Sequence, residues 1–465
     1  MIARVLSTAA LFLFASFAPA LAATQPPPSD AAILQMMAAR VDLQKQGTGI
    51  VVGIARPDGN RILSFGTLGL ADKRRMDGRT VFDVGSISKV LTALLLADMA
   101  QHHEVAIDDP VAKYLPGVSV PSRDGRAITL ADLATHTSGL PLRPANLPAK
   151  DPANPYAGYT RDDLFAFLSS YKLSHTPGTT YDYSNVGFGL LGVTLAERAK
   201  QDFADLIAAR ITGPLGMTDT RIVPNDDMTK RAAAGYDGDR NPVPHWDMGV
   251  LSSAGGYRST ADDLLKLVDA FLGFRKSPLY PAMERMTKTR RPGGMNPATA
   301  IALAWNIDDV DGREIVWKNG SVGGYRTFVG FDRAARLGVV ALINAQTGSG
   351  ADDIGLHTLD SSFSVNLEIP RTHVEIALDV ARLDQFVGRY RYSPTDMISV
   401  IRQGDHLYVV MAPGQPPLEI YAESANGFFF KIANAQITFD AVKNGHATKA
   451  IWHQSGTDQT GNRIP

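Results

Sequence analysis

Two β-rich stretches that bracket a long helical middle constrain the fold of this chain more than any other feature. Residues 50–55 and 61–65 are rich in β-forming side chains and flank an Asp-Gly turn, which predicts a hairpin. Similar runs return at 327–331 and 339–343. We therefore expect both stretches to join one sheet, with an all-helical subdomain over about 106–250 beside it.

Three helices are predicted around this middle. Apolar residues in 86–101 recur with the 3.6-residue period of an amphipathic helix packed on a core. Thr160, followed three residues later by Asp163, predicts the N-cap of a second helix. Ser259 or Thr260 is expected to cap a third helix over about 260–273.

The last part of the chain has a different pattern. After a connector at 361–382, β-forming residues fill 397–411 and 427–439, and turn signals separate them. The turn signals are Gly404-Asp405, Pro413-Gly414 and Asn444-Gly445. We expect a separate antiparallel β-barrel-like domain over 375–465.

Residues 1–22 have the pattern of a signal peptide. Arg4 supplies the positive charge, 5–17 form an apolar segment, and Ala20-Leu21-Ala22 is a small-residue cleavage site. The apolar run is shorter than the ~20 residues of a spanning helix, although an uncleaved anchor is the alternative. We expect a periplasmic or secreted protein with no stable membrane insertion after cleavage.

Composition excludes several classes of function. The 46 Lys+Arg balance 47 Asp+Glu, so no basic excess favours nucleic acid. The chain has no cysteine, which rules out disulfides and thiol nucleophiles, so covalent catalysis would use oxygen or nitrogen. The ten histidines form no metal-binding motif, and no G-x-S-x-G or P-loop motif is present. We expect no metal and no cofactor.

A serine and a lysine at S-x-x-K spacing, Ser86 and Lys89, are the first candidate catalytic pair. Ser86 is predicted at a helix start, where backbone N–H groups are free, and Lys89 lies one turn on, within reach of its hydroxyl. Ser169 and Lys172 repeat the spacing, but they end a predicted helix. The negative end of the helix dipole disfavours an alkoxide there. On this segment alone, a capping serine with a solvated lysine would remain the simpler interpretation.

Two further motifs favour the catalytic interpretation of Ser86 and Lys89 over the capping one. Tyr183 and Asn185 form the only Y-x-N among 14 tyrosines. Lys318 and Gly320 form a K-x-G element at the start of a Gly-rich β-run. K-x-G also occurs at two other places, of which one is a plain hairpin turn. The order of the three motifs along the chain and the Gly-rich β-run therefore select Lys318. The other matches begin at Lys45 and Lys443.

With these three motifs in this order, the sequence resembles the serine-reactive enzymes around class C β-lactamases, D-Ala-D-Ala carboxypeptidases and family VIII carboxylesterases. Residues 82–89, 130–140, 214–220 and 254–256 support the resemblance. It implies an α/β, β-lactamase/transpeptidase-like fold over 30–360, with an antiparallel sheet flanked by helices and the helical subdomain. The last 90 or so residues resemble the lipocalin-like domain of some exported members.

The resemblance also implies roles. Ser86 would be the acylated nucleophile, with Lys89 and Tyr183 sharing the proton transfers and Asn185 binding Lys89 or the substrate. Lys318, with Gly320, would lie on the strand beside the site. The N–H groups of Ser86 and Ser321 would form the oxyanion hole. Two lysines around Tyr183 are expected to favour a phenolate and to disfavour a second ammonium.

Asn319 departs from the family pattern, which has Thr at this position. That Thr helps to bind the substrate carboxylate, so the change weakens carboxylate recognition, although an amide can still donate. The expected substrates are D-Ala-D-Ala peptidoglycan peptides or β-lactams, because Lys318 is retained as a cation. The alternatives are a carboxylesterase and a penicillin-binding or cell-wall-binding protein with little turnover.

Overall fold

The computed structural model describes residues 26–464, except 149–150, 152, 292, 295–298, 349, 368–372, 394–395, 412–416, 432–434 and 455–456. The predicted signal peptide and the predicted turn at Pro413-Gly414 lie outside the described residues. Across the described ranges, no helix has the length and apolar character that crossing a membrane requires.

An eight-stranded antiparallel sheet joins the two β-rich stretches, as predicted. Its strand order is β2-β1-β14-β13-β12-β11-β10-β9, so the N-terminal hairpin pairs with a late strand, in the register Ile50↔Ile343. The bounds are β1 Gly49–Ala55, β2 Arg61–Gly66, β9 Arg290–Arg291, β10 Thr299–Ala302, β11 Asn306–Val310, β12 Arg313–Val322, β13 Tyr325–Asp332 and β14 Leu337–Ile343.

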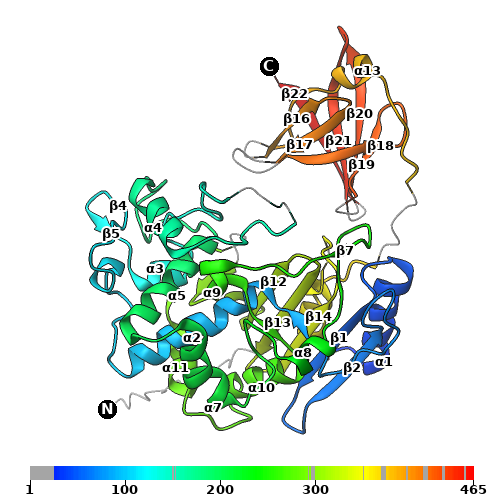
Figure 1. The fold of residues 1–465 in the computed structure, drawn as a ribbon. Coiled ribbons are helices and arrows are strands. Elements are labelled where there is room, and N and C mark those ends of the chain that lie inside the picture. The colour runs from blue at the N-terminus through cyan, green and yellow to red at the C-terminus, as the bar shows by residue number, and fades with distance from the viewer. Residues whose placement is uncertain are drawn as a thin grey trace, which may run out of the picture.

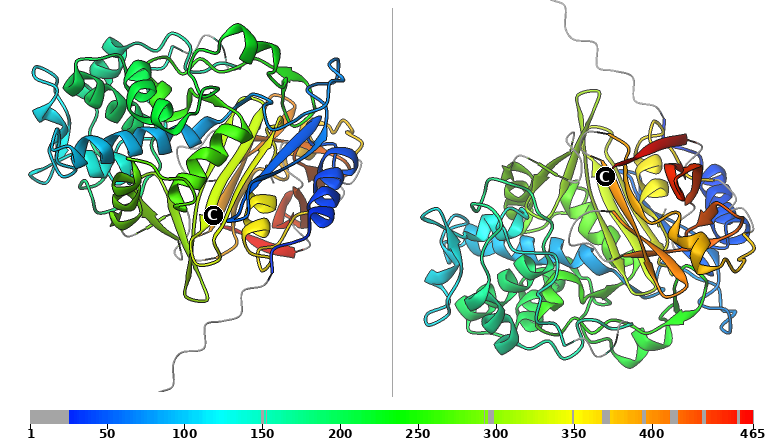
Figure 2. Two further views of the ribbon diagram at one scale, coloured as in Figure 1. Left: turned by 90° about the horizontal axis from the view of Figure 1, so that it is seen from below. Right: turned by 90° about the horizontal axis from the view of Figure 1, so that it is seen from above.

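Helices cover both faces of this sheet (Figures 1 and 2). α1 (Asp30–Ala38) and α12 (Asp352–Leu359) pack on one face, and α10 (Ala261–Phe271) packs on the other, beside the helical subdomain. Two apolar clusters result, one on each face, which is why every residue of β1 is buried. Thr260, rather than Ser259, caps α10.

The predicted helix at 86–101 is the centre of the molecule. It begins with a 3-10 turn, Gly85–Ile87, and continues as α2 (Ser88–Gln101). We predicted an amphipathic helix, but residues 88–100 are all buried, because α5 (Asn185–Ala199), α9 (Ser252–Gly255) and α11 (Tyr280–Lys288) surround it. The polar side chains of Ser88, Lys89, Thr92 and Asp98 therefore lie inside the protein.

The helical subdomain contains α3 (Leu130–Ala134), α4 (Arg161–Ser170), α5, α6 (Phe203–Ile207), α7 (Gly213–Leu215) and α8 (Asp226–Lys230). Thr160 and Asp163 form the predicted capping box of α4. The subdomain is not all-helical, since it holds two small hairpins, β4–β5 (Ser122–Arg123, Arg126–Ala127) and β6–β7 (Gly235–Tyr236, Pro242–Val243). The first closes through Asp124 and Gly125, both with positive φ, a tight turn that helical periodicity does not reveal.

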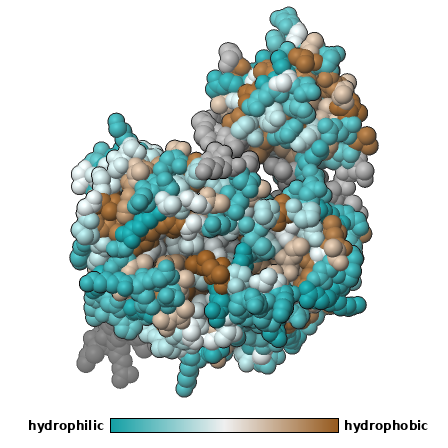
Figure 3. Space-filling view, in the orientation of Figure 1, coloured by the Kyte–Doolittle hydropathy of each residue, from teal (hydrophilic) through white to brown (hydrophobic). Residues whose placement is uncertain are grey.

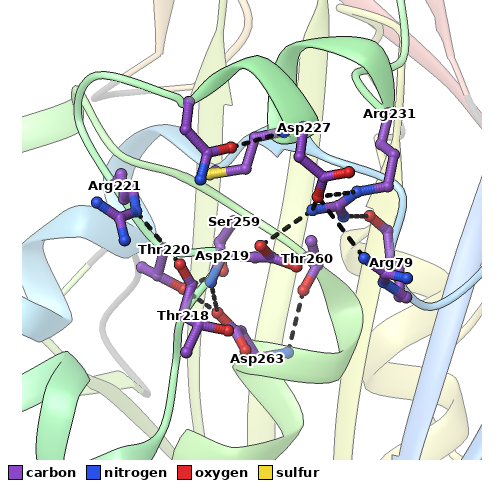
Figure 4. Close-up of polar contacts among 12 residues, drawn as sticks. Arg79, Thr218, Asp219, Thr220, Arg221, Asp227, Arg231, Ser259, Thr260 and Asp263 are labelled. Carbon is purple, nitrogen blue, oxygen red and sulfur yellow. Dashed lines mark hydrogen bonds and ion pairs between the residues drawn. The ribbon is translucent and has the colours of Figure 1, made fainter.

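Residues 214–220, which supported the resemblance, are held by a buried carboxylate (Figure 4). Asp263 accepts hydrogen bonds from the Asp219 N–H at 2.7 Å and the Thr220 hydroxyl at 2.9 Å, while its own N–H donates to Thr260. Thr220 also contacts Ser259, on β8 (Arg258–Ser259), which pairs with β3 (Phe82–Asp83) just before Ser86. This segment therefore acts in the framework of the site.

The C-terminal strands close into a barrel, drawn apart from the sheet in Figure 1. It has its own apolar core, built around Phe386, Tyr390 and Phe439. Asn444 and Gly445, both with positive φ, form the predicted hairpin turn. The bounds are α13 Val380–Asp384, β15 Gly388–Arg391, β16 Met397–Gln403, β17 His406–Val410, β18 Leu418–Ala422, β19 Gly427–Phe429, β20 Ala435–Lys443, β21 His446–Gln454 and β22 Thr457–Ile464. On the face drawn in Figure 3, hydrophobic residues form only small separate patches on both parts.

Candidate active site

Ser86 lies in a turn that passes directly against the edge of β12. A Cβ atom at Gly85 would lie 3.0 Å from the Ser321 nitrogen, and Gly85 has a φ of +52°. A Cβ at Gly320 would lie 2.1 Å from the Val84 carbonyl oxygen. Glycine at both positions lets the turn and the strand approach this closely. This close approach brings the backbone nitrogen of Ser321 beside the turn that holds Ser86.

Lys89 is fully buried, and three acceptors surround its Nζ atom. The distances are 3.1 Å to Ser86 Oγ, 2.8 Å to Asn185 Oδ1 and 2.7 Å to the Ala254 carbonyl oxygen. The 3-10 turn Gly85–Ile87, α5 and α9 each supply one of these acceptors. The S-x-x-K spacing predicted the first contact, and the other two depend on the tertiary fold.

Burial, and secondly the charge of Lys318, lower the pKa of Lys89 well below its usual value. A neutral amine has two N–H groups and one lone pair. If the two N–H groups donate to Asn185 and Ala254, the lone pair faces the hydroxyl of Ser86. The geometry therefore suits Lys89 to accept the Ser86 proton, and the sequence-based expectation that a second ammonium is disfavoured is confirmed.

Tyr183 contacts the same serine from the opposite side. Its hydroxyl donates to Ser86 Oγ at 2.7 Å. The Nζ atoms of Lys89 and Lys318 lie 4.9 and 4.7 Å from the centroid of its ring. Burial nevertheless raises the pKa of Tyr183 well above its usual value. The expectation of a phenolate is wrong, because burial opposes the charge of a phenolate more strongly than the hydrogen bond with Ser86 favours it.

His136 packs against the ring of Tyr183, a contact that the sequence did not reveal. The two rings lie 4.2 Å apart, and His136 Nδ1 accepts a hydrogen bond from the Ser184 N–H at 3.1 Å. Burial, followed by the charges of Lys318 and Lys89, lowers the pKa of His136 well below its usual value. His136 is therefore a neutral support for the tyrosine ring.

Asn185 begins α5 and links Lys89 to the helical subdomain. Its Oδ1 accepts from Lys89, and its Nδ2 donates to the Tyr156 hydroxyl at 3.0 Å. Trp246 contacts Tyr156 on one side, with ring centroids 5.8 Å apart. On its other side, Trp246 lies against the β12–β13 turn, at 2.3 Å from a Cβ built on Gly323. Tyr156 and Trp246 are further residues of the site that no short motif predicted.

Lys318 projects from β12 toward Tyr183, and its side chain is buried. Burial lowers the pKa of Lys318 to about 8, and the carboxylate of Asp352 opposes this shift. Among the described residues, its Nζ has no hydrogen-bond or ion-pair partner, which leaves the cation available to a ligand. Asn319, the next residue, donates from Nδ2 to Asp352 Oδ2 at 2.6 Å.

The second S-x-x-K pair lies elsewhere on the surface. Ser169 is exposed at the end of α4, and its hydroxyl donates to the Ala166 carbonyl at 2.8 Å. Lys172 is exposed beyond the helix end. Lys443 belongs to the β20–β21 turn, as predicted.

The part of the chain that the structure describes contains no cluster of three or more metal-ligating side chains. A serine in a first helical turn, contacted by a buried lysine and a tyrosine beside an antiparallel sheet, is the arrangement of a β-lactamase/transpeptidase-like enzyme. Residues 30–360 match the family model described as Beta-lactamase, and the chain belongs to this family of serine hydrolases. Residues 372–463 match a domain of unknown function (DUF3471).

Known relatives of the chain are hydrolases of two named kinds. The "D-alanyl-D-alanine-carboxypeptidase/endopeptidase AmpH" of Escherichia coli (strain K12) is 29% identical over 301 residues, which cover 62% of this chain and 77% of the relative. A class C beta lactamase structure from Rhodobacter sphaeroides has a TM-score of 0.60 at 27% identity, covering 71% of this chain and 97% of that one. The D-alanine carboxypeptidase AmpC structure from Burkholderia cenocepacia has a TM-score of 0.57 at 27% identity, with coverage of 68% and 95%.

Proposed function

We propose that the protein is an exported serine hydrolase that works through an acyl-Ser86 intermediate. The observation that carries this proposal is the pair of contacts on Ser86 Oγ, one from Lys89 Nζ and one from the Tyr183 hydroxyl. A serine oxygen between a low-pKa amine and a neutral phenol has both a base and an acid at hand. Catalytic roles for Ser86, Lys89 and Tyr183 follow from this arrangement.

In acylation, Ser86 Oγ attacks the substrate carbonyl while its proton moves to neutral Lys89. The oxyanion accepts hydrogen bonds from the N–H groups of Ser86 and Ser321, each of which contributes about 3–4 kcal/mol by analogy with other oxyanion holes. Tyr183 then donates its proton to the leaving group as the C–N or C–O bond breaks, and recovers a proton from Lys89. Water repeats the sequence in deacylation and restores Ser86.

The first candidate substrates are D-Ala-D-Ala peptides or β-lactams. The buried cation of Lys318 beside Tyr183 supports this choice, because both substrates have a carboxylate near the scissile amide. Relatives named as carboxypeptidases and β-lactamases support it as well. Asn185, Lys318, Asn319, Gly320 and Ser321 would then contact the substrate.

Ester hydrolysis is the second candidate, and a specific contact favours it. The Asn319 side chain, which stands at the expected carboxylate contact, donates to Asp352. A neutral ester needs Ser86, Lys89 and Tyr183 but no carboxylate contact. A penicillin-binding protein with little turnover is the third candidate, with the C-terminal barrel as a wall-binding module. For all three, the predicted signal peptide supports a periplasmic or secreted location.

Labelling with a fluorescent penicillin tests the nucleophile. We expect one adduct per wild-type chain by intact mass and none in Ser86→Ala, and equal labelling of both would refute the assignment. A substrate panel of a D-Ala-D-Ala peptide, nitrocefin and p-nitrophenyl butyrate then separates the candidates. Lys318→Ala should abolish turnover of the first two while sparing the ester, whereas a stable adduct with no turnover would indicate the binding protein.

A further inference from the structure

The carboxylate of Asp352 lies beside the site, and neither acylation nor deacylation uses it. Asp352 is the first residue of α12, on the face of the sheet opposite Lys89. Its Oδ2 accepts the 2.6 Å hydrogen bond from Asn319 Nδ2. Its Oδ1 is buried and has no hydrogen-bond partner among the described residues. A buried oxygen without a donor is costly for an ionised group, so this carboxylate is poorly satisfied within the protein.

The charged groups around Asp352 come from three elements. Lys318 approaches from β12, Arg326 from β13, and Asp353 from α12 itself. Asp353 is paired with the buried Arg40 at 2.7 Å. Burial raises the pKa of Asp352 to about 6, against the stabilising effects of Asn319 and Arg326. Asp352 is therefore mostly ionised at pH 7 and mostly protonated at pH 5.

An ionised Asp352 has two effects on a carboxylate-bearing substrate. It occupies an amide N–H of Asn319, which could otherwise donate to the substrate. It also offsets the positive charge of Lys318, since the two groups shift each other's pKa in opposite directions. A substrate carboxylate placed at Lys318 and Asn319 would meet the like charge of the residue that Asn319 contacts, whereas a neutral leaving group would not.

We propose that Asp352 is a specificity-determining residue that selects against substrates with a carboxylate next to the scissile bond and favours neutral leaving groups. This inference rests on the proposed acyl-Ser86 reaction, and within that proposal it favours the second candidate, ester hydrolysis, over the carboxylate-bearing D-Ala-D-Ala peptides and β-lactams. Protonation of Asp352 removes the negative charge. The protein should then accept carboxylate-bearing substrates better in acid than at neutral pH.

The test uses two esters that differ by one charge, phenyl phenylacetate and 3-carboxyphenyl phenylacetate. The measured quantity is the ratio of kcat/KM for the carboxylated ester to kcat/KM for the neutral one, at pH 5 and at pH 7. Titration of Lys89 affects both substrates alike and cancels in this ratio. Lys318, with a pKa of about 8, stays charged over this range. A purely structural role of Asp352 would also leave the ratio unchanged.

For the wild type we expect the ratio to fall roughly tenfold between pH 5 and pH 7, the size of effect that one partly screened charge produces. Asp352→Asn keeps an acceptor for Asn319, and it should raise the ratio at pH 7 by a similar factor and abolish its pH dependence. Glu314→Gln is the matched control, because Glu314 lies at the far end of β12 in an ion pair with Arg290. It should behave as the wild type does.

A ratio in Asp352→Asn within twofold of the wild type at both pH values would overturn the inference. Asp352→Ser is the second variant if Asp352→Asn does not fold. Ser86→Ala separates the two proposals. If it still hydrolyses both esters, the acyl-Ser86 proposal fails. If it is inactive while Asp352→Asn leaves the ratio unchanged, only the role of Asp352 fails.

Discussion

The chain contains two S-x-x-K elements with the same spacing and opposite surroundings. Ser86 and Lys89 begin the buried central helix, where Lys89 has no exposed surface. Ser169 and Lys172 stand at the end of α4, where both side chains are exposed. In the first pair the lysine contacts the serine at 3.1 Å, while in the second the serine donates to its own helix.

The two pairs differ in burial rather than in spacing, and burial is what lowers the pKa of a lysine. Lys89 loses its charge readily because water is excluded and Lys318 is near. Lys172 is exposed to water beyond the end of α4. The same four-residue pattern therefore places a serine beside a buried lysine of lowered pKa in one place and forms an ordinary helix end in the other.

Exchanging the two serines for alanine should produce the largest contrast. Ser86→Ala removes the attacking oxygen, and we expect kcat/KM for p-nitrophenyl butyrate to fall by about a thousandfold or more. Ser169→Ala should leave kcat/KM unchanged and alter the free energy of unfolding by no more than about 0.5 kcal/mol, because its side chain is exposed. Loss of activity in Ser169→Ala alone would mean that the wrong pair had been selected.

Replacing the two lysines should have the next largest effect. Lys89→Met fills the same buried space without a proton acceptor, so the rate of acylation should fall by about 10²–10⁴. Lys172→Met should acylate as fast as the wild type. Stopped-flow measurement of adduct formation with nitrocefin tests both variants, and thermal unfolding verifies that Lys89→Met is folded. Comparable rates in the two variants would remove Lys89 from the mechanism.

The tyrosines near the two pairs provide a smaller contrast. Tyr183→Phe keeps the ring between the two lysines but removes the hydroxyl bonded to Ser86. Lys89 still accepts the serine proton in this variant, so we expect kcat to fall by about a hundredfold, at the low end for an acid–base group. Tyr171→Phe, between Ser169 and Lys172, is the control and should retain full activity. A fully active Tyr183→Phe would limit Tyr183 to a packing role.

The smallest effect concerns the pH profile. Lys318 lowers the pKa of Lys89, and only neutral Lys89 can accept the Ser86 proton. Lys318→Ala should therefore raise the pKa of Lys89 and move the acid limb of kcat/KM for a neutral ester to higher pH. Lys443→Ala, in the exposed hairpin turn, should leave the limb in place. A shift to lower pH in Lys318→Ala would show that the two lysines are not coupled as proposed.

Local patterns predicted much of the fold and most of the site. The hairpin at 50–65, the capping box at Thr160 and the turn at Asn444-Gly445 depend on neighbouring residues, and all three are confirmed. The sequence-based prediction also placed Ser86, Lys89, Tyr183, Asn185 and Lys318 together, and the structure brings them together. Their catalytic roles remain predictions.

The features that the sequence-based prediction got wrong or missed depend on contacts between distant segments. Tyr183 remains a neutral phenol because burial, which no motif reports, opposes the charge of a phenolate. The fold places His136 against the ring of Tyr183. It also places the carbonyl oxygen of Ala254 beside the Nζ atom of Lys89. Asp352 is 33 residues from the asparagine that it binds, and nothing in the spacing connects them.

The sequence by itself determined which side chains could react. Without cysteine, a covalent enzyme must use oxygen or nitrogen, and the order of three short motifs selected Ser86 as the predicted nucleophile. Only the tertiary structure decided their protonation and their surroundings. The pKa of a group depends on how much water and which charges surround it, and residues far apart in the chain control both. Lys89, Tyr183 and Asp352 therefore acquire their chemical character from packing.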